Sequence, residues 1–181
     1  MTGPPPVRFG LCALAAAVLL AAVQPAPVRA ATPEARVKAA YLYKMASFVR
    51  WPAGAAGGAF RICIAGRPDI AGAVAELTGN QQVEGRPIAV TQLGARNAAE
   101  VRGCQILFLG RGGEQARNLL AAAGRAPVLT VTDRNNGSRG GAVEFVVQDG
   151  KVRFLIDRSE AESRALELSS KLLDVAAGVA P

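Results

Sequence analysis

The chain has 181 residues, carries a formal net charge of +7 and contains no histidine. The lack of histidine excludes Ser-His-Asp and Cys-His catalysis as these are usually built, and it excludes zinc and copper sites with histidine ligands. The basic residues are scattered singly, whereas nucleic-acid binding needs clustered positive charge. We therefore expect neither an enzyme nor a nucleic-acid-binding protein, and we expect no metal or other cofactor.

Residues 1–30 have the pattern of a secretory signal peptide that is removed after export. Arg8 is basic, residues 11–23 form an apolar run, and Val28-Arg29-Ala30 fits a small-residue cleavage site. The apolar run is too short to cross a bilayer, which takes about 20 residues, although an uncleaved anchor stays the alternative. The mature chain would be a single domain of residues 31–181, which is long enough to bury a core.

Two cysteines, Cys63 and Cys104, lie in the mature chain. An even number of cysteines in an oxidising compartment indicates one disulfide. The alternative is a pair of small buried thiols on strands that never join. The expected oxidising compartment and the even number of cysteines favour the disulfide.

The first helix of the mature chain begins at Thr32-Pro33-Glu34, which supplies an N-cap residue, a proline at the first helical position and an acid in the first turn. Trp51-Pro52 predicts its end, because proline disfavours helix in the residue before it. The predicted apolar stripe consists of Val37, Ala40, Tyr41, Met45 and Phe48.

Strands and short helices alternate through the middle of the chain, a pattern typical of parallel pairing. We expect strands at 60–65, 86–91, 104–109 and 128–131, helices at 69–78 and 112–123, and a helical turn at 97–102.

The C-terminal part predicts a β-hairpin followed by a long helix. Residues 142–147 and 152–156 are rich in β-branched and aromatic residues, and Asp149-Gly150 between them is a two-residue turn signal. From the predicted N-cap Ser159 onward, apolar residues fall on one helical face at Ala165, Leu168, Leu172, Val175 and Val179. We therefore expect an α/β fold: a single domain with a mixed sheet of five or six strands, helices on both faces, and a C-terminal hairpin plus helix.

Two segments are candidate binding surfaces. The loop 133–141 follows a predicted strand, where open α/β sheets commonly place ligand sites. Its arginines, asparagines and glycines could bind an anion or a protein loop, and the alternative is a solvated loop. Its candidate residues are Asp133, Arg134, Asn135, Arg139, Gly140 and Gly141. The other segment is Trp51-Pro52, whose aromatic edge could contact a partner and whose alternative role is core packing.

Two further patterns indicate less. The glycines of residues 110–113 lie between a strand and a helix, but the third glycine of a dinucleotide motif and the lysine of a P-loop are missing, so a plain turn is favoured. The acids Asp133, Glu144, Asp157 and Glu160 show no spacing that indicates a catalytic pair.

Several segments of the mature chain form a combination that resembles a known family. Residues 38–42 and 48–52 combine a helix with a closing Trp-Pro, and residues 61–64 and 104–108 are strands that each carry a cysteine. These segments, together with 128–133, 140–143, 152–157 and the Leu-Ser-Ser-Lys-Leu-Leu of 168–173, resemble the YfiR-like family of periplasmic regulators.

The resemblance implies a non-enzymatic protein of the periplasm. Such a protein would bind the periplasmic region of an inner-membrane diguanylate cyclase and hold it inactive, which lowers cyclic di-GMP signalling and biofilm formation. The redox state of Cys63 and Cys104, or an outer-membrane lipoprotein, would tune the release of the cyclase. A homodimer is also compatible with the family. The alternative that the residues leave open is a periplasmic protein that binds a small anion at the loop 133–141.

Overall fold

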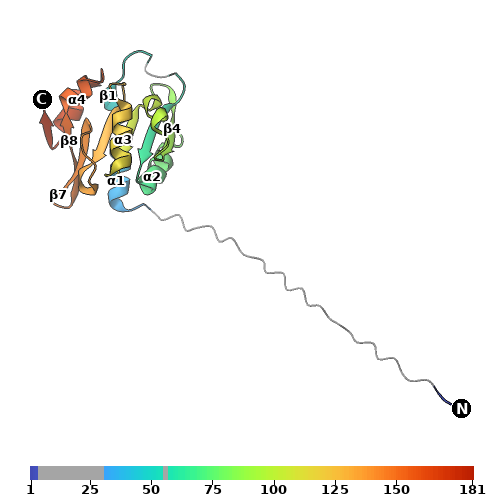
Figure 1. The fold of residues 1–181 in the computed structure, drawn as a ribbon. Helices are drawn as coiled ribbons and strands as arrows, with labels where there is room; N and C mark the ends of the chain where they lie inside the picture. Colours follow the sequence, from blue (N-terminus) through green and yellow to red (C-terminus); the bar gives the residue numbers. More distant parts are fainter. Residues whose placement is uncertain (4–30, 55–56) are drawn as a thin grey trace.

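The computed structural model describes residues 1–3, 31–54 and 57–181, so residues 4–30 of the expected signal peptide lie outside the described part. No helix in this described part is long and apolar enough to span a bilayer. Residues 31–181 fold into one mixed sheet with helices on its two faces (Figure 1). The helical elements are α1 (Pro33–Phe48), α2 (Pro68–Thr78), η1 (Ala98–Gly103), α3 (Glu114–Ala123), η2 (Arg134–Asn136), α4 (Arg158–Glu162) and α5 (Ser170–Asp174).

The sheet has eight strands in the order β10-β8-β7-β6-β5-β2-β4-β3, rather than the five or six that the sequence predicted. Strands β4, β2, β5, β6 and β7 run parallel, β8 is antiparallel to β7, and β3 is antiparallel to β4. The eight strands are β2 (Phe60–Ala65), β3 (Gln82–Val83), β4 (Arg86–Leu93), β5 (Ile106–Leu109), β6 (Leu129–Asp133), β7 (Val143–Gln148), β8 (Lys151–Asp157) and β10 (Gly178–Ala180). A separate two-stranded ribbon pairs β1 (Val49–Arg50) with β9 (Glu167–Leu168).

Both faces of the sheet carry a hydrophobic core. On β2, Ile62 and Ile64 join the core beneath α1 and α2, whereas Cys63 and Ala65 join the core beneath α3 and η1. This alternation follows from the two-residue period of a strand, which turns successive side chains to opposite faces. The structure therefore confirms the mixed α/β class and the helices on both faces.

The hairpin β7–β8 confirms the turn signal. Gln148 pairs with Lys151, so Asp149 and Gly150 form a two-residue connection. Both turn residues have positive φ, 50° and 70° respectively, as the tight turns of right-twisted hairpins require.

The first helix begins as predicted but turns a different face to the core. The Thr32 Oγ1 accepts a hydrogen bond from the Ala35 N–H at 3.2 Å, which confirms the N-cap. The helix ends at Phe48, before Trp51-Pro52, because the chain continues as β1. Val37, predicted to be buried, is exposed, and the buried residues of the helix are Ala35, Lys38, Ala39, Leu42, Met45 and Ala46.

The long C-terminal helix was a wrong prediction. Asp157, not Ser159, caps the short α4 by accepting the Glu160 N–H at 2.9 Å, and Ala165 then adopts a left-handed φ of 56° that ends helical geometry. Leu168 pairs with Val49 in the ribbon, and a second helix starts at its own cap, Ser169. The predicted stripe residues Val175 and Val179 are exposed, so the local periodicity did not correspond to one buried face.

The two cysteines form the disulfide that their even number and the expected compartment favoured. Cys63 on β2 and Cys104, just before β5, are both buried, and their Cα atoms are 5.9 Å apart. The bond joins two adjacent parallel strands and closes a chain segment with a sequence separation of 41. A loop of this length corresponds to a stabilisation of about 4 kcal/mol on the chain-entropy model.

We predict that Cys63→Ser and Cys104→Ser each lower the free energy of unfolding by about the same amount, up to roughly 4 kcal/mol, because either change removes the same cross-link. The double mutant should lose no more than either single mutant. Chemical denaturation of the three variants in oxidising buffer measures these values. Strictly additive losses would instead mean that the two thiols contribute independently to the core.

Candidate functional site

Three loops meet at the carboxyl edge of the sheet, where open α/β folds often bind ligands. They are residues 66–67 after β2, 110–113 after β5 and 133–141 after β6. The loops are packed directly on one another: the Gly112 N–H donates to the Asn136 carbonyl at 2.9 Å, and a side chain at position 112 would collide with the backbone of Gly137. The loops therefore touch backbone to backbone at this point, and beside the contact they leave a hollow of about 220 Å³ lined by Arg117 and Arg139 among others. Gly112 serves this close approach, and Gly110 leaves room for the side chains of Arg67 and Phe108, consistent with the plain turn that the sequence favoured.

A fully buried ion pair lies beneath these loops. The Nζ atom of Lys38, on α1, is 2.6 Å from the Oδ2 atom of Asp133, at the end of β6, and neither side chain is exposed. Glu34, one turn earlier on α1, also contacts the Lys38 Nζ at 2.5 Å. Asn136 donates to the same Asp133 oxygen at 2.8 Å. Asp133 is therefore a structural anchor below the surface, and its carboxylate cannot itself meet a macromolecular partner.

Sequence reasoning did not single out Lys38 as a site residue. The signal was present, because Lys38 follows Ala35 by three residues and precedes Leu42 by four, which places it on the buried stripe of α1. A lysine on an apolar stripe requires a buried partner, since an unpaired charge in a core is costly.

Arg67 and Asp69 extend this charge network toward solvent. The Arg67 Nε and Nη2 donate to the two carboxylate oxygens of Asp69 at 2.8 and 2.7 Å, and the Arg67 Nη1 lies 3.8 Å from Asp133. The hydrogen bonds from Arg67 are the largest cause that lowers the pKa of Asp69 below its ordinary value. The same bonds raise the pKa of Arg67.

The exposed residues of the loop 133–141 are largely engaged within the protein. The Arg134 Nε donates to Glu144 Oε2 at 2.8 Å, and Glu144 Oε1 accepts the Gly140 N–H at 2.8 Å. Asn135 Oδ1 accepts the Val147 N–H at 2.8 Å. Arg134, Gly140 and Glu144 also line a cavity of about 420 Å³ that continues along β8 and β10.

The other two candidates in this loop differ from each other. Gly141 is buried, and a Cβ atom there would lie 2.8 Å from the Thr130 carbonyl oxygen, so this position serves close backbone packing. Arg139 is exposed and has no hydrogen bond or ion pair within the described residues. Among the six candidates, Arg139 thus offers the cation best placed to meet a partner.

Trp51 and Pro52 lie at the opposite end of the sheet. The Trp51 Nε1–H donates to the Gln105 carbonyl at 3.2 Å, and the indole packs edge-on against Phe60 with ring centroids 5.1 Å apart. Pro52 is exposed. Gln105 directly follows Cys104, so the anchor of Trp51 is one residue away from the disulfide. The structure therefore does not join the two candidate segments into one site.

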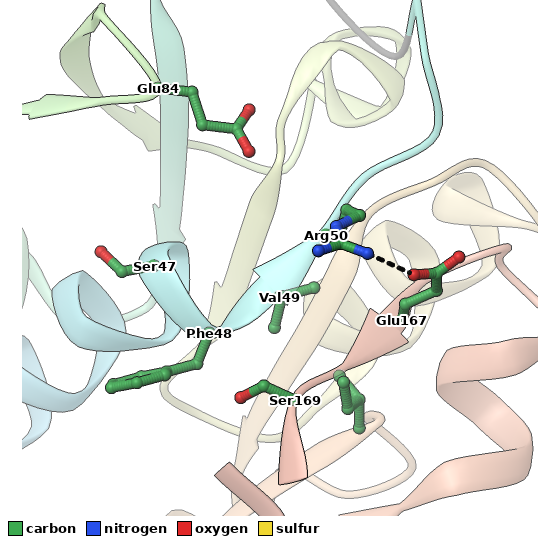
Figure 2. Close-up of a pocket in the computed structure, with 8 residues that line it drawn as sticks. Ser47, Phe48, Val49, Arg50, Glu84, Glu167 and Ser169 are labelled. Carbon is green, nitrogen blue, oxygen red and sulfur yellow. Dashed lines mark hydrogen bonds and ion pairs between the residues drawn. The ribbon is translucent and has the colours of Figure 1, made fainter. Parts of the chain in front are cut away.

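The β1–β9 ribbon forms a surface beside Trp51, which we call the ribbon surface and define as Arg50, Trp51, Pro52, Glu162 and Glu167. These residues line a cavity of about 530 Å³ together with Ala53, Ala165 and Leu166. A second hollow of about 270 Å³ shares Arg50 and Glu167 with this cavity (Figure 2).

The close-up in Figure 2 shows how the ribbon is held. Arg50 reaches across to Glu167, and their Nη1 and Oε2 atoms are 3.2 Å apart. Both side chains are largely exposed, at 79% and 73%, so solvent screens the pair and it contributes little stability. Glu84 stands across the hollow, apart from this pair. The ribbon surface thus presents charges that a partner can rearrange at low cost.

Gln105 is the second residue that sequence reasoning missed. It is buried inside an otherwise apolar segment, where its side-chain Oε1 accepts the Arg61 N–H at 2.7 Å. A single glutamine in the run Cys104–Leu109 was the available signal, because a buried amide in a strand needs hydrogen-bond partners.

We predict that Lys38→Met lowers the free energy of unfolding by about 3–5 kcal/mol, because it leaves the buried Asp133 carboxylate without its hydrogen-bonded cation and with only the more distant Arg67 nearby. Denaturant titration of the purified variant measures the loss.

Lys44→Met is the matched control, since Lys44 is exposed on the same helix and its replacement should change stability by less than about 0.5 kcal/mol. The double mutant Lys38→Met/Asp133→Asn should lose less than the sum of the two single mutants, as expected for coupled groups. Equal losses for Lys38→Met and Lys44→Met would contradict the importance of the buried pair.

We predict that Asp69→Asn destabilises the protein at neutral pH and that the difference from the wild type shrinks below about pH 4. The folded-state pKa of Asp69 is lowered, so its contribution is present above the unfolded-state pKa and is lost as the pH falls through the folded-state value. Thermal unfolding between pH 2 and pH 7 (roughly the range in which carboxylates titrate) tests this. A difference that stays constant with pH would show that Asp69 acts through packing alone.

Comparison with known proteins identifies a family. A family model described as YfiR/HmsC-like matches residues 35–177, which is nearly all of the folded domain. A search of curated proteins finds no match. Among solved structures, the chain is similar to a conserved domain protein from Vibrio cholerae, with 10% sequence identity and a TM-score of 0.50. That match covers 81% of this chain and 60% of the Vibrio chain, and at this low identity it supports the fold alone.

Proposed function

The chain belongs to the YfiR/HmsC-like family, and from that premise we propose that it is a periplasmic protein that binds the periplasmic region of an inner-membrane diguanylate cyclase and represses it. Repression would lower cyclic di-GMP signalling and biofilm formation. The observation that carries this proposal is the family match over residues 35–177, since this family acts by regulation through protein partners.

Two features of the chain support export to an oxidising compartment. Residues 1–30 have the composition of a cleaved signal peptide. Cys63 and Cys104 are joined in a buried disulfide, and structural disulfides persist mainly outside the reducing cytosol. We therefore place the mature protein in the periplasm as part of this proposal.

The ribbon surface is the contact that we favour for the cyclase. It combines an exposed proline, a half-buried tryptophan and charges of both signs beside a large hollow, as in interfaces where an aromatic anchor is surrounded by polar groups. Trp51 is held by the Gln105 carbonyl, next to Cys104. Reduction of the disulfide would free the segment around Gln105 and so loosen Trp51, which offers a physical route by which redox state could tune release.

The loop 133–141 is the second contact that we propose, with Arg139 as its accessible cation. The loop and the ribbon surface lie at opposite ends of the sheet, so a second partner, such as an outer-membrane lipoprotein, can bind the loop while the cyclase binds the ribbon surface. Binding of a small anion here has less support. In one cavity Glu144 neutralises the Arg134 guanidinium, and the two arginines that line the neighbouring hollow, Arg117 and Arg139, are both exposed to solvent. We accordingly propose a protein-binding role without catalysis.

We predict that the tagged protein recovers a diguanylate cyclase from solubilised inner membranes and that a reductant lowers the recovery. Pro52→Arg should reduce recovery at least about tenfold if the ribbon surface is the contact, because the change puts an extra cation at the interface without altering a buried side chain.

Glu76→Arg, an exposed change on α2, which contributes no residue to either candidate surface, is the control and should leave recovery unchanged. Arg139→Glu tests the second surface in the same way. If no membrane protein is recovered by the wild type under either redox condition, the proposed function is wrong.

A further inference from the structure

The outer edge of β4 is unpaired along most of its length. On its inner side, β4 pairs with β2 from Ile88 to Leu93. On its outer side, β3 pairs only with Arg86 and Pro87. In the described part of the chain, no other strand continues the sheet beyond residues 88–93. Six consecutive residues therefore lack a strand partner on the outer side of the sheet.

The pleat fixes which backbone groups face outward. The Ala65 carbonyl of β2 accepts the Gly110 N–H on the β5 side, at 2.9 Å, so the neighbouring residues of β2 direct their groups to β4. In a parallel ladder with this register, alternate residues of β4 bond to β2 and the others point away. The outward N–H and C=O groups are those of Ile88, Val90 and Gln92.

This edge lacks the devices that usually protect exposed strands. Residues 88–93 contain no charge and no proline, and Ile88 and Val90 are apolar side chains that remain partly exposed. Natural edges are normally short, charged, interrupted by proline or covered. The edge strand on the opposite side of the sheet, β10, follows that rule, because it has three residues and is followed by Pro181. The β4 edge is therefore suited to receive another strand.

We propose that the β4 edge pairs antiparallel with the β4 edge of a second copy of this chain, so that two eight-stranded sheets join across a two-fold axis. A two-fold interface uses the same surface on both copies and must be self-complementary. Residues 88–93 meet this condition, because an uncharged edge faces no like charge when it meets itself.

The flanking charges favour the antiparallel direction. Glu84 precedes β4 and Arg96 follows it; both are exposed, and neither has an ion-pair partner in the described residues. Antiparallel pairing brings the Glu84 end of one copy beside the Arg96 end of the other. A parallel arrangement would place like charges together. Residues 88–93 themselves include none of the ribbon-surface residues, although the flanking Glu84 also lines the hollow beside Arg50 and Glu167.

Gln92→Pro tests the proposal, with Gln92→Ala as the matched control. Gln92 is exposed and its side chain makes no hydrogen bond in the described chain, so both variants remove the same side chain. Only proline removes the outward N–H, a change that a free edge tolerates. In sedimentation equilibrium, the wild type and Gln92→Ala should be dimers, and Gln92→Pro should have a dissociation constant at least about tenfold higher, because one donor is lost from each copy.

A wild type that remains monomeric at all accessible concentrations would overturn the proposal, as would a Gln92→Pro variant that dimerises like the wild type. Amide hydrogen exchange of the wild type gives an answer that needs no variant. Exchange at residues 88–92 should slow as protein concentration rises, while exchange at the other edge strand, 178–180, should not change. Slower exchange at another surface instead of residues 88–92 would place the self-contact there. Slower exchange at residues 88–92 only after a cyclase fragment is added would assign the edge to that fragment. Either result would contradict self-pairing.

Discussion

The ion pair between Lys38 and Asp133 fixes how the first helix lies on the sheet. The two residues are 95 positions apart in sequence and both are fully buried. Such a pair adds little net stability compared with apolar residues, but leaving one charge alone is expensive, so it excludes arrangements in which the partners separate. Only one rotation of α1 brings the lysine to β6, and that rotation places Ala35, Ala39 and Leu42 against the core.

Other features follow from this placement. Because the lysine defines the buried face, Val37 turns to solvent although it is apolar. The small side chains of Ala35 and Ala39 let the helix approach the sheet closely, at a position where larger residues would leave no room for the buried charges. Asp133 in turn positions Asn136, and the loop that begins there locks against Gly112. The rigid carboxyl edge of the sheet thus depends on a charge carried by the first helix.

The sequence predicted those helices, strands and turns that are determined by residues close together in the chain. The strand Phe60–Ala65, the helix Pro68–Thr78 and the hairpin around Asp149-Gly150 formed close to their expected bounds. The prediction of one long helix after residue 158 failed. The helical spacing of its apolar residues competed with two separate N-caps and with a short ribbon strand whose partner is more than 100 residues away. The shortest strands, such as β9 and β10, are defined by their pairing alone and carry no pattern of their own.

The candidate site was predictable only in outline. The sequence drew attention to the loop 133–141 and to Trp51-Pro52, but it could not distinguish an exposed Arg139 from a buried Asp133, because burial depends on a lysine from another part of the chain. It also could not show that the two segments lie at opposite ends of the sheet. The carbonyl that anchors Trp51 is at the start of β5, whereas the loop follows the end of β6.

The loops at the carboxyl ends of the strands and those at the amino ends differ in how easily they can change conformation, and this difference bears on regulation. At the carboxyl edge, close glycine packing and buried charges act together, so a small chemical signal cannot loosen one part without unfolding the rest. At the amino edge, the Trp51 indole packs against Phe60, and its one hydrogen bond goes to the residue beside a disulfide. A regulator needs an element with two accessible arrangements that a signal can bias. The amino edge has the simpler construction for such an element, and this supports the proposal that a partner contacts the ribbon surface.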